Sequence, residues 1–241
     1  MVHRVSVPAA MRVHVAFTPA EEVAAPVGIV VDVLRATSTI VQALAAGYRR
    51  VLCCAEVEEA RAVASDQGDA VLGGERKTVR IPGFDFGNSP GEFLEPAAAT
   101  LVLTTSNGTR LLLAAAARCD LVLVGSLLNL TAVAEAARAR GVEDVAVLCA
   151  GVRGELALDD AYCAGRIAEV LGGEPADSAA AAIRLARTFP TAEEGLSASQ
   201  SARNLRASGL SRDIAYCARE SVLDVAPRLS RMLGQCAEVA L

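Results

Sequence analysis

The fold is decided by VGIVVDVLRATSTIVQALAAG, residues 27–47, which joins a continuous apolar run to an Ala/Leu-rich segment through a charged loop. An apolar run without alternation predicts a strand buried on both faces, and the segment 37–47 indicates a helix. Asp32 closes the apolar run, where a carboxylate is costly unless it is paired or binds a metal. Residues 27–47 therefore predict a strand, a polar loop and a helix of an α/β fold.

Apolar strands and amphipathic helices alternate along the chain as far as Gly172. The predicted pairs are 50–53 with 56–65, 100–104 with 110–117, 121–124 with 129–141, and 144–150 with 159–171, while strand 70–73 leads into a long loop over 75–96. Near-continuous apolar strands between helices predict a three-layer α/β/α fold with a mostly parallel sheet. Mixed pairing within that sheet stays open.

Residues 173–241 have a different pattern, with helical stretches at 179–188, 191–201 and 212–219 and a short apolar segment at 221–225. Two interpretations stay open, because this helical C-terminal part can be a cap or the end of the same domain. A chain of 241 residues with 53% hydrophobic residues can bury one substantial core. We therefore expect residues 1–241 to form a single unit.

Composition argues against several classes of protein. The net charge is −5 and the basic residues are scattered, which argues against a nucleic-acid or membrane partner. Charges interrupt the hydrophobic stretches before the roughly 20 residues of a membrane span, and the N-terminus lacks an apolar leader, so we expect a cytoplasmic protein.

Cysteine and histidine usage narrows the chemistry further. The seven cysteines include no C-x-x-C pair, which predicts mostly buried thiols and neither a disulfide framework nor a zinc site. The two histidines, His3 and His14, lie near the N-terminus. The central loops therefore lack the usual base of a Ser-His or Cys-His enzyme.

Polar residues gather where the predicted strands end. Ligands of open α/β sheets bind at the edge where the carboxyl ends of parallel strands meet. Arg35, Arg76 and Arg110 follow three different strands, and their guanidinium groups can hold phosphate, carboxylate or sulfonate oxygens. Acidic residues accompany them, namely Asp32, Glu75, Asp85, Glu155, Asp159 and Asp160. Two or three carboxylates beside a phosphate site can hold Mg²⁺.

Each of these features also has an ordinary structural interpretation. Thr37 or Ser38 can cap a helix, and Asn107-Gly108 is a common turn dipeptide. Asp32 can be a structural cap. The acids can pair with the arginines, and those near 155–160 also suit the N-terminus of a helix.

Six motifs together are similar to those of a known family. They are VDVLRATST (31–39), GGER (73–76), GFDFGNSP (83–90), TTSNGTR (104–110), GSLLN (125–129) and CAG (149–151). On these motifs the chain resembles the 2-phosphosulfolactate phosphatases of the ComB family, from about Val27 to Gly165. Ser106 stands where the family often has threonine, which keeps the hydroxyl group. Beyond Gly172 the resemblance carries over only a role for Asp213.

The resemblance implies Mg²⁺-dependent hydrolysis of 2-phospho-3-sulfolactate to sulfolactate and phosphate, in a coenzyme M pathway. Such a substrate carries three anionic groups, which suits loops that carry arginines. We predict as catalytic residues Asp32, Arg35, Glu75, Asn107 and Arg110. We predict as substrate-binding residues Arg76, Thr37, Asp85, Asn88, Thr105, Gly108, Thr109, Ser126 and Asn129. We predict that Mg²⁺ is held by Asp32 together with a second acid, which is either Glu75 or one of the pair Asp159 and Asp160.

Several alternatives stay open. A metal-activated water can attack the phosphate, or Asp32 can form an aspartyl-phosphate, although Leu34 stands where haloacid-dehalogenase-type phosphatases carry a second acid. The chain can be a phosphatase for another phospho-hydroxy acid, or a sensor that binds such an acid without hydrolysis. Nucleotide binding is a weaker alternative because both glycine-rich phosphate-loop patterns are missing. A homo-oligomer is also left open.

Overall fold

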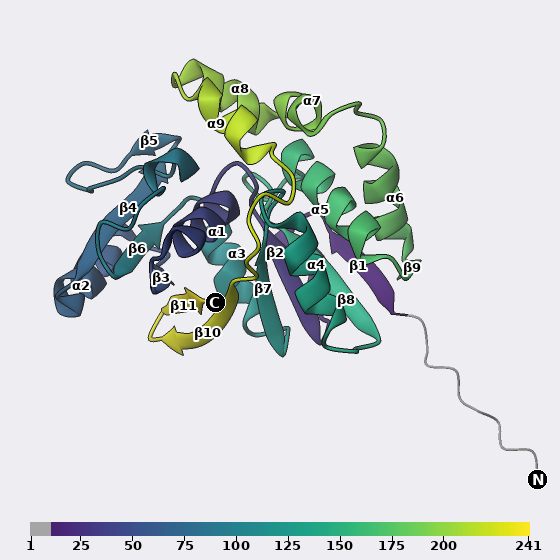
Figure 1. The fold of residues 1–241 in the computed structure, drawn as a ribbon, viewed down its shortest axis with the longest axis horizontal. Helices are drawn as coiled ribbons and strands as arrows, with labels where there is room; N and C mark the ends of the chain where they lie inside the picture. Colours follow the sequence, from purple (N-terminus) through teal and green to yellow (C-terminus); the bar gives the residue numbers. More distant parts are fainter. Residues whose placement is uncertain (1–10) are drawn as a thin grey trace, which may run out of the picture.

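The computed structural model describes residues 11–241, so His3 lies outside the described part. Eleven strands form one mixed sheet, in the order β5-β4-β6-β3-β11-β10-β7-β2-β8-β1-β9 (Figure 1). The strands are β1 (Arg12–Ala16), β2 (Val27–Val31), β3 (Arg50–Cys53), β4 (Ala70–Arg76), β5 (Val79–Arg80), β6 (Thr100–Thr104), β7 (Leu121–Gly125), β8 (Asp144–Cys149), β9 (Glu174–Pro175), β10 (Arg228–Leu233) and β11 (Cys236–Ala240).

Within the described residues, nine α-helices and two short 3-10 helices accompany the sheet. The α-helices are α1 (Ala36–Ala46), α2 (Val57–Gln67), α3 (Gly108–Ala115), α4 (Leu130–Arg138), α5 (Leu158–Leu171), α6 (Asp177–Ala186), α7 (Ala192–Ser197), α8 (Gln200–Ala207) and α9 (Ser211–Cys217). The 3-10 helices are η1 (Pro19–Glu21) and η2 (Pro90–Glu92). This composition confirms the predicted α/β class, the mostly parallel sheet and the helical C-terminal part.

The sheet consists of two parallel blocks. The first block contains β7, β2, β8, β1 and β9, and every pair of neighbours in it is parallel. The second block contains β4, β6 and β3, which are also parallel. The two blocks do not pair with each other directly, because two other strands separate them.

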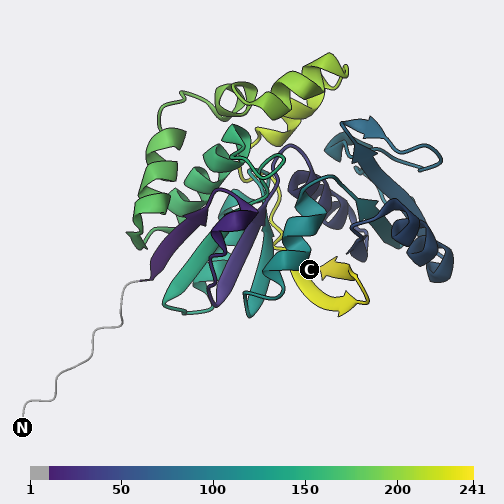
Figure 2. The same cartoon turned by 180° about the vertical axis from the view of Figure 1, so that it is seen from behind.

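The C-terminal hairpin of β10 and β11 fills the space between the blocks. β11 pairs antiparallel with β3 over three residues, whereas β10 pairs with β7 at the single position Arg228 opposite Leu123. Figure 2 shows the hairpin, in yellow, between the strands of the two blocks. The sequence pattern after Gly172 predicted helices and no strand, so this hairpin was not predicted. Together with β5, which pairs antiparallel with β4, it makes the sheet mixed.

Helices cover both faces of the sheet, as near-continuous apolar strands require. Ile29 and Val31 of β2 pack in one core with residues of α4 and α5, whereas Val30 packs in a second core with residues of α1 and α3. A third, smaller core lies under α2, where Leu52 and Val102 meet Ala60. All five residues of β2 are buried, because each face of that strand meets one of the two larger cores.

The hairpin is covalently tied to the second block. Cys54, directly after β3, forms a disulfide with Cys236 at the start of β11, across 182 residues of sequence. The sequence prediction missed this pair, because no local spacing marks two cysteines so far apart. Four of the five free cysteines are buried, as predicted. No helix of the described chain is long and apolar enough to cross a membrane.

Candidate active site

A cavity of about 410 Å³ opens beyond the carboxyl ends of strands from both blocks. Loops after β2, β4, β6 and β8 form its walls, together with α5 and α8. The lining residues are Asp32, Leu34, Arg35, Glu75, Lys77, Thr78, Asn88, Thr105, Ser106, Asn107, Gly151, Val152, Arg153, Asp159, Asp160, Ser201, Asn204, Leu205, Ala207 and Ser208. Of the described residues that line it, none is a histidine.

Asp32 lies at the end of β2 and is 8% exposed. Its Oδ1 accepts a hydrogen bond from the backbone N–H of Ala36, at 3.3 Å. Gly108 packs directly against the carboxylate, since a Cβ at that position would lie 2.7 Å from Asp32 Oδ2. Burial, and then the negative charge of Asp159, raise the pKa of Asp32 to about 7. Asp32 can therefore exchange a proton near neutral pH.

Asp159 and Asp160 begin α5 on the same side of the cavity, but they differ in their partners. Asp160 accepts backbone hydrogen bonds from Val33 at 2.9 Å and Gly151 at 3.0 Å, one on each oxygen. Asp159 accepts one from the Ser201 hydroxyl at 3.1 Å, and burial raises its pKa to about 6. Asp160 thus holds the loops after β2 and β8 together, whereas Asp159 keeps free acceptor capacity toward the cavity.

Glu75 holds the opposite wall. Its Oε1 accepts from the Ser106 N–H at 2.9 Å, and its Oε2 accepts from the Thr78 N–H at 2.8 Å. Both oxygens therefore fix backbone segments that follow β4 and β6. A metal ion bound by Glu75, as predicted, would have to compete with these two hydrogen bonds for the carboxylate oxygens.

Two tight turns present basic side chains to the cavity. Lys77 and Thr78 connect β4 to β5, with φ of 52° and 69°. Arg153 and Gly154 form a second two-residue turn, with φ of 56° and 80°, closed by hydrogen bonds between Val152 and Glu155. Positive φ at both central residues is typical of type I′ turns, which favour Asn and Gly over Lys or Arg. A basic residue in this conformation points to a function rather than to turn stability.

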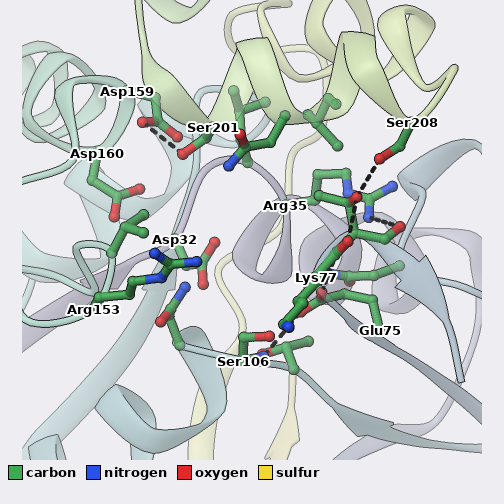
Figure 3. A pocket seen from close by; sticks show the side chains of 18 of the residues that line it. Asp32, Arg35, Glu75, Lys77, Ser106, Arg153, Asp159, Asp160, Ser201 and Ser208 are labelled. Carbon is green, nitrogen blue, oxygen red and sulfur yellow. Dashed lines mark hydrogen bonds between the residues drawn. The ribbon is translucent and has the colours of Figure 1, made fainter.

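The two basic residues approach the cavity from different blocks. Figure 3 shows Arg153 pointing toward Asp32 and Lys77 extending from the facing wall. Within residues 11–241 neither Lys77 nor Arg153 forms an ion pair. Both cations are therefore available to an anionic ligand. Arg153 also lines a second cavity, of about 430 Å³, that shares Asp159 and Ser201 with the first.

Arg35 lines the cavity but already has an acidic partner. Its Nη1 donates to Asp213 Oδ2 of α9 at 2.6 Å, and both side chains are less than a tenth exposed. The Ser89 hydroxyl donates to the other Asp213 oxygen. This ion pair joins the loop after β2 to the C-terminal helices, and it gives Asp213 a structural partner beside the cavity.

Asn88 has an unsatisfied acceptor in this cavity. Its side-chain Oδ1 is buried without a hydrogen-bond partner among the described residues, while the Thr39 hydroxyl donates to its backbone carbonyl at 2.9 Å. A buried acceptor without a partner is costly, so a donor or a cation is expected there when a ligand binds. Thr105 and Asn107 also line the cavity, and the Asn107 side chain does not cap α3.

Arg110, predicted as catalytic, and Arg76 and Asp85, predicted to bind substrate, are held outside the cavity by local partners. Arg110 is 61% exposed and pairs with Glu56 at 2.7 Å. Arg76 donates to the carbonyls of Glu75 and Ala55 and to the Thr104 hydroxyl. Asp85 accepts from the Leu72 N–H at 2.8 Å and holds the long loop against β4. Each side chain is directed by local partners away from the ligand space, which their positions in the sequence could not reveal.

Other predicted binding residues support the loops from behind. The Thr37 hydroxyl donates to the Asp32 carbonyl at 3.0 Å, and Thr109 hydrogen-bonds Thr105 at 3.1 Å. Asn129 accepts from Ser126 and donates to the carbonyls of Val124 and Val225. Asn129 and Ser126 are fully buried, so they tie β7 to the C-terminal segment and do not face the cavity.

The residues that sequence reasoning missed are Lys77, Arg153, Ser201 and Asn204. Lys77 has only a weak signal in the sequence, since Lys-Thr is not a common hairpin turn. Arg153-Gly154 follows a predicted strand end and could have been read as a turn. Ser201 and Asn204 lie on α8, and only the tertiary structure brings that helix to the cavity.

The acidic residues fit a Mg²⁺ ion that keeps much of its water. Within residues 11–241, no three of the cavity's acids bring their ligand atoms within 4.8 Å of one another. The acids Asp32, Glu75, Asp159 and Asp160 therefore form no closed cage of three carboxylates. Mg²⁺ usually binds through one or two carboxylates together with substrate phosphate and waters. Asp32 and the unpartnered Asn88 oxygen match that donor chemistry.

Comparison with known proteins shows the family to which this chain belongs. The family model described as 2-phosphosulpholactate phosphatase matches residues 14–231. A probable 2-phosphosulfolactate phosphatase of Thermus thermophilus is 40% identical over 232 residues, which cover 93% of this chain and 97% of that protein. One from Symbiobacterium thermophilum is 41% identical, covering 87% of this chain and 93% of the relative. The 2-phosphosulfolactate phosphatase of Methanothermobacter thermautotrophicus is 37% identical, with 90% and 92% covered. The chain therefore belongs to the 2-phosphosulpholactate phosphatase family.

Proposed function

We propose that this protein hydrolyses the phosphate ester of 2-phospho-3-sulfolactate to 3-sulfolactate and phosphate, with Mg²⁺ as cofactor. The names of its relatives point to this substrate. The observation that carries the proposal is the facing arrangement of Arg153 and Lys77 around the buried carboxylate of Asp32 in one cavity. A substrate with phosphate, carboxylate and sulfonate groups needs cations on more than one wall.

Lys77 and Arg153 are the cations that we assign to the substrate. Neither has an acidic partner within residues 11–241, in contrast to Arg35, whose charge is balanced by Asp213. Each ammonium or guanidinium can donate charge-assisted hydrogen bonds to an anionic group. The backbone N–H groups of Ser106 and Thr109 near the start of α3 already donate to Glu75 and to the Thr105 hydroxyl, so we assign the anionic groups to the two cations.

Asp32 is the residue that we assign to the cation, with Asn88 Oδ1 as a neutral ligand. A bound Mg²⁺ would neutralise phosphate charge and lower the pKa of a coordinated water. Asp159, whose pKa burial raises to about 6, is the carboxylate that we assign as proton acceptor for the attacking water. Phosphoryl transfer has a loose, highly charged transition state, so alignment and electrostatics supply most of the rate enhancement.

The test is release of inorganic phosphate from 2-phospho-3-sulfolactate, with and without Mg²⁺. We expect Mg²⁺-dependent turnover that Asp32→Asn abolishes, while the exposed control Asp66→Asn leaves it unchanged. Phospholactate, which lacks the sulfonate, should be a poorer substrate. Faster turnover of phospholactate would assign the enzyme to another phospho-hydroxy acid, and normal activity of Asp32→Asn would remove Asp32 from the mechanism.

Two alternatives can be separated by the same preparation. Binding of the substrate without phosphate release, with or without Mg²⁺, would indicate a sensor. A covalent route through Asp32 would give a phosphorylated or phosphate-mimic adduct by mass spectrometry. We favour the attack of water, because Leu34 lines the cavity where an aspartyl-phosphate enzyme of the dehalogenase type would place its second acid.

A further inference from the structure

A second cluster of metal-binding side chains lies where the hairpin joins the second block. Cys54 follows β3, Cys236 begins β11, and Glu59 lies in the first turn of α2. Their Sγ and carboxylate atoms all lie within 4.8 Å of one another. None of the three lines the candidate active site, so the cluster is separate from the phosphatase chemistry. In Figure 1 β3 and β11 lie side by side, and α2 lies beyond them toward the outer edge of the molecule.

The Glu59 carboxylate in this cluster lacks a compensating donor or cation. Glu59 Oε2 is buried and has no hydrogen-bond partner among the described residues. Cys54 and Cys236, whose sulfur atoms lie beside it, and the next residue Ala60 all belong to the small apolar core under α2. A carboxylate oxygen held in apolar surroundings is unfavourable unless a cation or a donor meets it. The disulfide provides neither.

The donor set becomes suitable for a metal once the disulfide is reduced. Two thiolates and one carboxylate, with water in the fourth position, are typical ligands of Zn²⁺ and other thiophilic dications. Glu59 is half-buried, which leaves a side from which an ion and a water molecule can approach. Cys54 and Cys236 are fully buried, so their thiolates would be stabilised chiefly by the ion itself.

We propose that Cys54, Cys236 and Glu59 form a binding site for one thiophilic dication of the Zn²⁺ class, open when the two cysteines are thiols and closed when they form the disulfide. A phosphine reductant breaks the S–S bond, takes an oxygen atom from water to become a phosphine oxide, and leaves the two protons of that water on the thiols. Binding of the dication then releases two protons. In either state the hairpin is joined to the second block.

The test uses the full chain, reduced with a phosphine or left oxidised, and titrated with Cd²⁺ as a spectroscopic substitute for Zn²⁺. We expect the reduced protein to bind one Cd²⁺ per chain with a thiolate-to-metal charge-transfer band in the ultraviolet, and the oxidised protein to show no such band. Zn²⁺ added afterwards should displace the Cd²⁺. The same band in both redox states, or no band in the reduced protein, would overturn the proposal.

Matched variants assign the ligands. Glu59→Gln should weaken the binding of Cd²⁺ by about tenfold or more, as loss of a metal-orienting group does. The neighbouring Glu58→Gln, on the exposed side of the same helical turn, should leave the affinity unchanged. Cys236→Ser should abolish the band, whereas Cys119→Ser, in a half-buried free cysteine elsewhere, should retain it. Equal affinity of the Glu59 and Glu58 variants would exclude the carboxylate, and a band in Cys236→Ser would exclude the site.

Discussion

The two parallel blocks meet the same cavity with different chemistry. The first block contributes the crowded acids Asp32, Asp159 and Asp160, whose pKa values are all raised by burial. The second block contributes Glu75, whose two oxygens both hold backbone N–H groups. Each block also contributes one tight turn with a basic residue, Arg153 after β8 and Lys77 after β4. The comparison teaches that acids in one cavity need not share a role, because free acceptor capacity decides which of them can serve a metal or a proton.

The largest effect on activity should come from substituting the acid Asp32 of the first block, in comparison with Glu75 of the second block. Asp32→Asn should lower kcat by about 10³-fold or more with little loss of folding free energy, because it removes the negative charge from the reacting centre. Glu75→Gln should instead lower the free energy of unfolding by roughly 1–3 kcal/mol and change activity less, because it weakens two loop anchors. Steady-state kinetics and urea unfolding of both variants check this. Similar kinetic losses with similar stability losses would contradict the division of roles.

The hairpin should be held much more firmly to the second block than to the first. Cys236→Ser should lower the free energy of unfolding by roughly 2–4 kcal/mol in the oxidised protein, since the disulfide closes a long loop. Hydrogen exchange should show faster exchange in β11 than in the wild type. A control, Cys119→Ser, leaves the disulfide intact and should change stability little. If Cys236→Ser leaves the unfolding midpoint unchanged under oxidising conditions, the disulfide does not stabilise the attachment of the hairpin to the second block.

Substitution of the basic residue in either tight turn should raise KM to a similar extent, although the two turns belong to different blocks. Lys77→Asn and Arg153→Asn should each raise KM by about tenfold, since each removes a charge-assisted contact to substrate. Their stability should stay equal or rise by up to ~1 kcal/mol, because asparagine suits positive φ better than a long basic side chain. Arg110→Asn, on an exposed helix face, is the matched control. If the double variant shows an effect well below the product of the single ones, the two cations do not bind separate groups.

Within any one pH unit, the smallest effect concerns the acids of the first block. Asp32 has a pKa of about 7 in the folded protein against an ordinary 3.8, so between these values the folded chain holds a proton that the unfolded chain has released. Metal-free stability should therefore fall as pH rises through this window, by at most roughly 1.4 kcal/mol per pH unit for this group. Mg²⁺ competes with the proton, so its stabilising effect should be larger at pH 8 than at pH 5.

Urea unfolding of the metal-free protein across this range measures the slope. Asp32→Asn should flatten the slope and reduce the response to Mg²⁺. If the variant and the wild type share one slope, the raised pKa belongs to another group. A response to Mg²⁺ that is equal at both pH values would argue against a titrating ligand.

Much of the fold was predictable, because strands buried on both faces leave a continuous apolar pattern in the sequence. β2, β6, β7 and β8 were predicted in this way, and the helices between them followed. The hairpin of β10 and β11 was not. Its first strand is largely exposed and carries Arg228 and Arg231, so its sequence lacks the apolar run of a central strand.

The candidate site was predictable in part. The strand-end rule identified Asp32, Glu75 and Asn107, because the residue after a buried strand lies at the edge of the sheet whatever the strand order. Asn88 lies in the long loop 75–96 and was predicted from the family resemblance alone. The rule could not tell that Arg76 and Arg110 turn to local partners. It also could not find Lys77 and Arg153, since their direction depends on the hand of two tight turns.

The sequence by itself determined the alternation of buried strands and helices, the acid at the end of β2 and the family. Burial on both faces and the chemistry of strand ends are local properties, so they can be read from neighbouring residues. Only the tertiary structure decided which cations face that acid, which carboxylates keep free oxygens, and how Cys236 reaches Cys54. These depend on contacts between residues that are distant in the chain, and no local pattern encodes the direction of a side chain across such a distance.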